Sequence, residues 1–282
     1  MNPNLVAVKG GLAAMRIELR QLYTNGTSLV GQFLTPALFL IAIFFLRDRN
    51  YHDTDLSIGE LAVPGLLGCV IAFNGLYGIA EVLALDREDG TLLRAKTVPN
   101  GIVGYFIGKV GTTAGAVLVQ LVVIVSLGAV IVGGFSVSGG DVVTLAWVVV
   151  LGLLATLPIG AILGGLIVGA RDIFLLTLPL LGMIAISGIW YPITALPGWL
   201  QSLAQLFPMY WLGLGMRSAL LPAEAVAIEI DGSWRHLETA AVLGVWSIVG
   251  LLVAPIVLRR AARHESGSSV AVRREKAMQR AF

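Results

Sequence analysis

Six stretches of at least eighteen residues are almost free of charged side chains. They cover residues 29–46, 61–80, 106–132, 142–169, 173–191 and 239–258, and the one charge within them is Lys109, near the start of the third. A helix needs about 20 apolar residues to cross the hydrocarbon core of a bilayer. The sequence therefore predicts an all-α polytopic membrane protein with six transmembrane helices in a single domain, residues 1–260, with Lys109 snorkelling to the interface.

The overall composition excludes an ordinary soluble domain. Hydrophobic residues make up 57% of the chain and charged residues 13%, with a mean hydropathy of +0.87. The net charge of +2 is too small to indicate a nucleic-acid partner. The single cysteine, Cys69, has no intrachain mate and is interpreted as a core residue. The first apolar stretch ends in FFLRDRN without a small-residue cleavage site, so it predicts a span and not a cleavable signal.

The connections between the predicted spans are alternately rich and poor in basic residues. With both termini in the cytoplasm, fifteen Lys and Arg lie inside and four lie outside. Cytoplasmic loops of membrane proteins carry the excess of basic residues. This split predicts a multi-pass protein of the cell (inner) membrane with N and C termini cytoplasmic. The inner set is Lys9, Arg16, Arg20, Arg87, Arg94, Lys96, Lys109, Arg171, Arg259, Arg260, Arg263, Arg273, Arg274, Lys276 and Arg280, and the outer set is Arg47, Arg49, Arg217 and Arg235.

Residues 5–23 predict an amphipathic helix that lies in the cytoplasmic interface. Basic Lys9, Arg16 and Arg20 flank one apolar stripe, although Ile17 falls on the opposite side. A soluble helix packed on a partner is the alternative. The stripe recurs at intervals of three and four residues and consists of Leu5, Val8, Leu12, Met15, Leu19 and Leu22.

Glycines and caps give further detail of the spans. Small residues on one face let helices approach closely in lipid, so the glycines of the third and fourth spans predict close helix packing. Ser57 with Glu60 predicts a capping box, and Asp141 and Asp172 are predicted N-caps. The glycines at helical spacing are Gly104, Gly108, Gly111 and Gly115 in the third span and Gly160 and Gly164 in the fourth.

Four prolines divide the apolar segment 192–222 into pieces too short to cross a bilayer. Pro197 can open a short helix and Pro208 can stop it. The segment predicts a re-entrant or interfacial hairpin on the outer side, with aromatic residues at headgroup level. The tail, residues 261–282, is basic and polar and is predicted to be mobile in the cytoplasm, near anionic membrane lipids. The aromatic residues of the predicted rim are Trp190, Tyr191, Trp199, Tyr210 and Trp211.

The sequence contains no recognisable motif that could supply energy for transport or carry out catalysis. The sequence GYFIGKV departs from a phosphate loop in its glycine spacing and lacks the Ser or Thr after the Lys. The three histidines are far apart, and no acid or base lies at a span centre. We therefore predict no catalytic, cofactor-binding or metal-binding residue and no enzymatic activity. If the protein moves a substrate uphill, we expect the energy to come from another subunit.

Six charges fall within residues 86–99, between the second and third apolar stretches. Glu88 and Asp89 precede Gly90, residues 91–96 favour helix, and Pro99 ends it. This pattern predicts a short cytoplasmic helix over 91–96. A solvated loop that only sets topology is the alternative.

Two motifs resemble the membrane permeases of ABC type-2 exporters, of the daunorubicin-resistance and polysaccharide or lipid exporter kind. The first is an acid, Gly-Thr-Leu, a basic helix and a Pro nine residues after the Gly, carried here by Glu88, Gly90 and Pro99. The second is SGIWYPITALPGWLQSLAQLFPMYWLGLGMRSAL, which Arg217 closes. The resemblance extends over most of residues 5–258, including the span order and the amphipathic entry helix, but not over the tail.

The resemblance implies a permease subunit of an ATP-driven exporter for a hydrophobic or lipid-linked drug, lipid or glycan. It implies a dimer of permeases, either a homodimer or a heterodimer, and two copies of an ABC ATPase that hold the ATP and magnesium. ATP binding would push the entry helix and a coupling helix and open a path along the first and fifth spans. The implied ATPase-coupling residues are Asp86, Arg87, Glu88, Asp89, Gly90, Thr91, Leu92, Arg94, Lys96 and Pro99. The implied outer gate comprises Ser187, Gly188, Trp190, Tyr191, Pro192, Pro197, Trp199 and Pro208.

Other function classes remain open from the residues alone. An ion-coupled secondary transporter or channel would move cargo without an ATPase, and a membrane-embedded enzyme would turn over in isolation. A non-transporting membrane protein is the third alternative. Association with an ABC ATPase discriminates the exporter from all three.

Overall fold

A computed structural model of the chain describes residues 3–51, 56–98, 100–133, 135, 138–167 and 172–264. Most of these residues form helices joined by turns and short loops, and the described part contains no strand, only one isolated bridge between Asn50 and Ser57. The predicted all-α class is confirmed for the described part of the chain. Pro99 and most of the predicted tail, residues 265–282, lie outside it.

Five helical segments of the described residues are long and apolar enough to cross a membrane. The second is one continuous helix that includes a π-helical turn, η1. The segments are α2 (Gly26–Leu46), the run of α3 (Ile58–Phe73), η1 (Asn74–Gly78) and α4 (Ile79–Glu88), α6 (Gly101–Val132), α7 (Gly139–Leu166) and α11 (His236–His264).

The fifth predicted span is shorter in the structure than in the sequence pattern. The helix within 173–191 is α8 (Phe174–Ile186), which has only 13 residues. It ends because Gly188 adopts a positive φ of 65° and Pro192 follows. The structure thus supports five membrane-length helices in its described part, and a sixth crossing stays a prediction.

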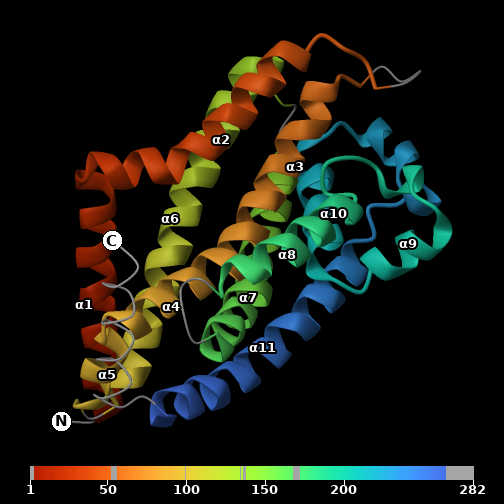
Figure 1. Cartoon of the computed structure of the whole chain (residues 1–282). Helices are drawn as coiled ribbons and strands as arrows, with labels where there is room; N and C mark the ends of the chain where they lie inside the picture. Colours follow the sequence, from red (N-terminus) through yellow and green to blue (C-terminus); the bar gives the residue numbers. More distant parts are fainter. Residues whose placement is uncertain are drawn as a thin grey trace.

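The remaining elements complete the bundle. Figure 1 shows α5, the start of α1 and the end of α11 gathered at one end, with α9 toward the other. Pro197 precedes α9, as the proline spacing predicted. Pro208 was predicted to stop that helix, but α9 already ends at Ala204 and Pro208 opens α10. The elements are α1 (Pro3–Thr24), α5 (Thr91–Lys96), α9 (Gly198–Ala204), α10 (Pro208–Leu220) and the 3₁₀ turns η2 (Ile193–Ala195), η3 (Ala223–Ile228) and η4 (Ile230–Gly232).

Helix α10 lies in the protein core and not at a headgroup rim. All thirteen of its residues are buried, and it packs against α3 and α7. Tyr210 and Trp211 are 0% and 3% exposed, so the prediction that they rim the outer face is wrong. Trp199, on α9, is 69% exposed. The proline pattern locates the breaks in the chain, but the burial of α10 is decided by α3 and α7, which are distant in sequence.

Helix α7 contacts α11, α10, α4 and η1. Its glycines allow this, because a Cβ at Gly160 would lie only 2.7 Å from the Leu76 carbonyl oxygen in the π turn. A Cβ at Gly164 would lie 2.8 Å from Cα of Ala80. The predicted close packing of the fourth span is therefore confirmed, and its partner is the second membrane-length helix.

The glycine stripe of α6 receives the entry helix α1. Gly104 meets Ala7, Gly108 meets Gly11, and the stripe continues against Met15 and Leu19, so the two helices run parallel. The buried face of α1 is only partly the predicted apolar stripe. Leu5 and Leu12 stay exposed at 51% and 48%, because backbone proximity selects the small Ala7 and Gly11 for the interface.

Helix caps match the sequence in one place and differ in two. Ser57 and Glu60 form the predicted capping box of α3. At α7 the N-cap is Ser138, and Asp141 is the third helical residue of the box, so its prediction as N-cap is wrong. Asp172 is not the N-cap of α8 either, because that helix starts after Ile173 without a side-chain cap.

The packing of α1 on α6 predicts opposite effects for two adjacent glycines. Gly10 has nothing within 4 Å of an added Cβ, whereas at Gly11 that Cβ would lie 2.5 Å from the Gly104 carbonyl oxygen. Both replacements gain about 1 kcal/mol of helix propensity. Gly10→Ala should leave thermal stability in lipid nanodiscs equal or higher, and Gly11→Ala should lower it. Equal melting temperatures for both variants would contradict this packing.

Candidate functional site

A sharp turn joins α4 to α5 in the segment predicted to couple. Gly90 has a φ of 79°, in the left-handed region that favours glycine. The Asp89 carboxylate accepts from the Thr91 amide at 2.9 Å and from its hydroxyl at 2.7 Å, which fixes the start of α5. Leu92 is buried, while Arg94 is exposed and donates to the Thr91 hydroxyl at 2.9 Å. The predicted helix over 91–96 is confirmed with the same bounds.

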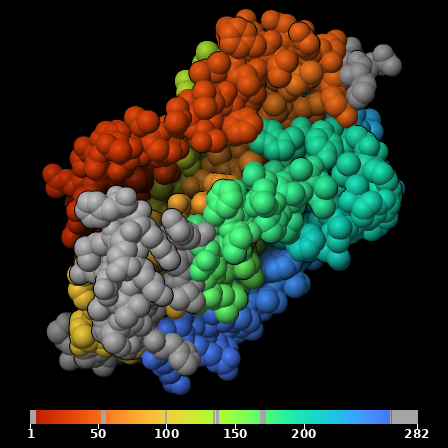
Figure 2. Space-filling model, in the orientation of Figure 1, coloured from red at the N-terminus to blue at the C-terminus, as the bar shows by residue number. Residues whose placement is uncertain are grey.

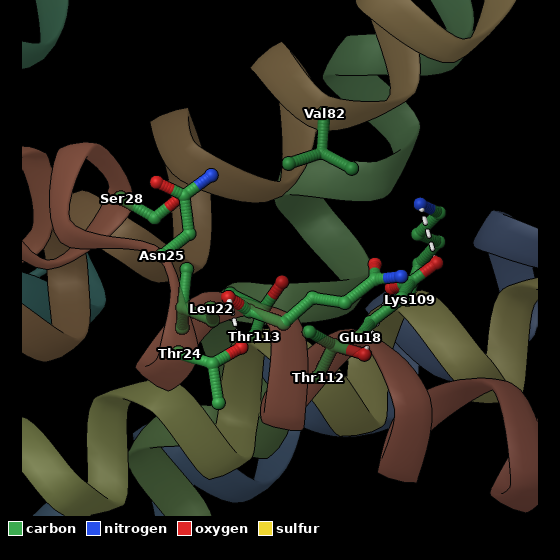
Figure 3. Close-up of a pocket in the computed structure, with 10 residues that line it drawn as sticks. Glu18, Leu22, Thr24, Asn25, Ser28, Val82, Lys109, Thr112 and Thr113 are labelled. Atoms are coloured by element: carbon green, nitrogen blue, oxygen red, sulfur yellow. Dashed lines mark hydrogen bonds and ion pairs between the residues drawn. The ribbon is translucent and has the colours of Figure 1, made fainter.

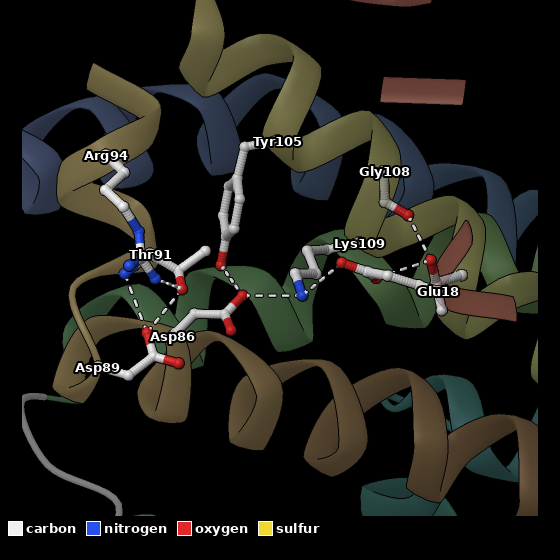
Figure 4. Close-up of polar contacts among 9 residues, drawn as sticks. Glu18, Asp86, Asp89, Thr91, Arg94, Tyr105, Gly108 and Lys109 are labelled. Atoms are coloured by element: carbon white, nitrogen blue, oxygen red, sulfur yellow. Dashed lines mark hydrogen bonds and ion pairs between the residues drawn. The ribbon is translucent and has the colours of Figure 1, made fainter. Parts of the chain in front are cut away.

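A charged cluster lies next to this turn. Lys109 Nζ is 2.8 Å from Glu18 and 3.0 Å from Asp86, and its side chain is 14% exposed. The Tyr105 hydroxyl donates to Asp86 at 2.7 Å, and the Thr112 hydroxyl donates to Glu18 at 3.0 Å. Figure 4 shows Glu18, Lys109 and Asp86 in one row that joins α1, α6 and α4. Lys109 is thus the centre of an ion cluster and does not simply snorkel.

Arg87 points into the protein instead of outward. It is 6% exposed and donates to the carbonyl oxygens of Gly165 at 3.0 Å and Ile167 at 2.6 Å. The last carbonyls of a helix have no partner within that helix, so Arg87 caps the end of α7. The predicted coupling residues therefore divide into inward-facing Asp86 and Arg87, and surface groups such as Arg94 on α5.

A second charged cluster is buried near the predicted outer gate. Arg217 is 0% exposed, and its Nε lies 2.6 Å from a Glu229 carboxylate oxygen. It also donates to the carbonyl oxygens of Gly188 at 3.0 Å and Ile189 at 3.3 Å. Arg217 thereby ties α10 to the turn after α8. Sequence reasoning placed Arg217 at the end of the motif but missed Glu229, whose one signal was a carboxylate within an apolar run, AVAIEI.

The predicted gate residues separate into two groups. Ser187, Gly188 and Pro192 are buried, and the Trp190 ring stacks on Phe39 of α2 with centroids 4.9 Å apart. Pro208 is buried at the start of α10. The other three do not join a common site. Tyr191 is half-buried, and Pro197 and Trp199 are exposed.

The described part of the chain contains no cluster of three or more His, Cys, Asp or Glu side chains that could hold a metal ion.

Five membrane-length helices, an entry helix and a short helix between the second and third of them define a multi-pass membrane component. The profile of the family described as ABC-2 type transporter matches residues 12–221, and the chain belongs to this family. It is a permease-type transport component, whose family works with an ABC ATPase. No curated protein matches the chain.

The Arg217 and Glu229 pair predicts a large loss of stability when either partner is removed. Glu229→Ala leaves a buried guanidinium unpaired and should lower the free energy of unfolding by about 3–5 kcal/mol. Arg217→Met should do the same, and the double variant should cost less than the sum of the two. Unfolding in denaturant measures the effect, with exposed Glu224→Ala as the control. Strictly additive effects would refute the pairing.

Proposed function

We propose that the chain is the membrane-spanning permease subunit of an ATP-driven exporter for a hydrophobic or lipid-linked cargo. Two permease copies, as a homodimer in the simplest case, act with two ATPase subunits that carry ATP and magnesium. The complex lies in the cell (inner) membrane with six spans per permease and both termini in the cytoplasm. Residues 86–99 and the entry helix receive the motion of the ATPase.

The ion cluster around Lys109 is the observation that carries this proposal. It joins α1, α4 and α6 directly beside the turn that leads into α5. A push on α5 would reach α4 through a two-residue turn, and α1 and α6 through partly buried ion pairs. Such a rigid junction suits a point where force enters, whereas a loop that only sets topology needs no connection to three helices.

The exposed surface of α1 carries basic and apolar side chains, although its parallel packing on α6 departs from a helix that lies flat in the interface. Lys9, Arg16 and Arg20 are exposed on the same helix as exposed Leu12 and Ile17. Basic and apolar groups together suit the boundary between headgroups and acyl chains.

The exposed apolar faces of α2 and α8 support a partner copy on that side. Only 17% of the most apolar 18-residue stretch of α2 is buried. On α8, the side chains of Phe174, Leu175 and Leu178 are each more than half exposed. Figure 2 shows this face hollowed between α2 and α8. The hollow suits a path along the first and fifth spans between two permease copies.

Charge reversal at residue 88 tests the coupling. Glu88→Arg, and Gly90→Pro at a φ that proline cannot adopt, should leave the protein inserted but remove ATP-driven export. The control is Glu224→Arg, the same reversal at an exposed carboxylate near the other end of the bundle. The measurements are co-purification of the ATPase and efflux of a fluorescent hydrophobic dye with ATP. Normal ATP-dependent efflux by both variants, or loss only in the control, would contradict the proposal.

Labelling of single cysteines tests the sixth span and the orientation. In a Cys69→Ser background, Asp172→Cys and Thr194→Cys flank α8, and both positions are exposed. A membrane-impermeant maleimide should label residue 194 in intact cells, and residue 172 only after permeabilisation. Thr97→Cys should behave like residue 172. Labelling of 172 and 194 from the same side would show that α8 does not cross.

A further inference from the structure

A polar pocket of about 450 Å³ opens between α1, the start of α2, α4 and α6. Hydroxyl and amide side chains make up much of its wall, with Glu18 and Lys109 at one side. Figure 3 shows Asn25 and Ser28 facing this space from above, and Thr112 and Thr113 from below. The pocket lies next to the ion cluster, at the end of the bundle proposed to be cytoplasmic.

Several groups in the wall are free to bind a ligand. The side chains of Gln21, Ser28 and Thr113 make no hydrogen bond within the described residues. Asn25 uses its oxygen to accept from the Thr27 amide at 3.0 Å, which leaves its amide nitrogen without a partner there. Polar groups that are gathered in a pocket and unpaired can exchange water for the hydroxyl or amine groups of a ligand.

The charges of the pocket disfavour an anion. Lys109 already contacts two carboxylates, so Lys109, Glu18 and Asp86 together carry one net negative charge. Glu18 lines the pocket with its side chain 31% exposed. A phosphate or carboxylate headgroup would meet this carboxylate, whereas an ammonium or hydroxyl group could donate to it.

A second, mainly apolar pocket of about 340 Å³ lies further along α2 and α6. Its wall includes Gln32, one turn after Ser28 on α2, and Gln120, two turns after Thr113 on α6. Gln120 donates to the Gln32 carbonyl, and Gln32 Nε2 is buried without a partner among the described residues. The rest of the wall is mainly apolar and includes the stacked rings of Phe39 and Trp190.

We propose that the two pockets together bind an amphiphile whose headgroup donates hydrogen bonds and carries no negative charge. The headgroup lies in the polar pocket, beside Glu18 and Thr113, and the apolar part extends past Gln32 toward Phe39. This assignment names the substrate class of the proposed exporter and rests on that function for its direction of transport. The binding itself requires neither ATP nor the ATPase.

Three amphiphiles with the same dodecyl tail isolate the headgroup. Dodecylamine, dodecyl maltoside and dodecyl phosphate are titrated into the full chain in phosphatidylcholine nanodiscs, and binding is followed by tryptophan fluorescence and native mass spectrometry. We expect the amine and the maltoside to bind at least about ten-fold more tightly than the phosphate. Equal affinities, or tightest binding of the phosphate, would overturn the proposal.

Two substitutions separate the contributions of charge and hydroxyl. Glu18→Gln keeps the side-chain shape and should weaken dodecylamine about ten-fold while changing the maltoside little. Thr113→Val should weaken the maltoside, whereas Thr144→Val, at a half-buried position of α7 that lines neither pocket, should not. Identical affinities in all variants would mean partition into lipid and refute the site. Since no ATPase is present, this result would leave the coupling test untouched, and failure of coupling would leave the binding result standing.

Discussion

The Lys109 ammonium lies between Glu18 and Asp86, and the end of the molecule that we propose to contact the ATPase depends on this interaction. Two carboxylates from α1 and α4 meet one cation from α6, and each would be costly to bury without the others. The close approach of α1 to the glycines of α6 brings Glu18 within reach. Helix packing and electrostatics therefore depend on each other here, and the entry helix becomes part of the bundle.

Local signals in the sequence predicted local structure well. Helix α5 has the predicted bounds because Gly90 and the residues around it decide the turn without help from the rest of the chain. The capping box at Ser57 follows the same logic. The apolar runs predicted four of the membrane-length helices and the apolar part of α11, since length and hydropathy alone decide whether a helix can cross.

The contacts between residues distant in the sequence could not be predicted from the sequence. Glu18, Asp86 and Lys109 lie in three different helices, and nothing in their spacing indicates that they meet. Glu229 pairs with Arg217 from a 3₁₀ region whose course depends on the folded core. The burial of α10 was missed for the same reason, because a helix that is apolar and interrupted by prolines suits an interface as well as a core. Sequence identified which residues were unusual but not their partners.

Two arginines that are buried in the described structure donate to carbonyl oxygens before and after α8 in the sequence. Neither of these contacts was predicted from the sequence. Arg87, from the end of α4, holds carbonyls at the end of α7, just before α8. Arg217, from α10, holds the carbonyls of Gly188 and Ile189, just after α8. Helix α8 has 13 residues, and the turn that follows it is held by Arg217. In the proposed exporter, motion of α5 would pass through α4 and Arg87 to the end of α7, whereas Arg217 would hold the turn at Gly188 against α10.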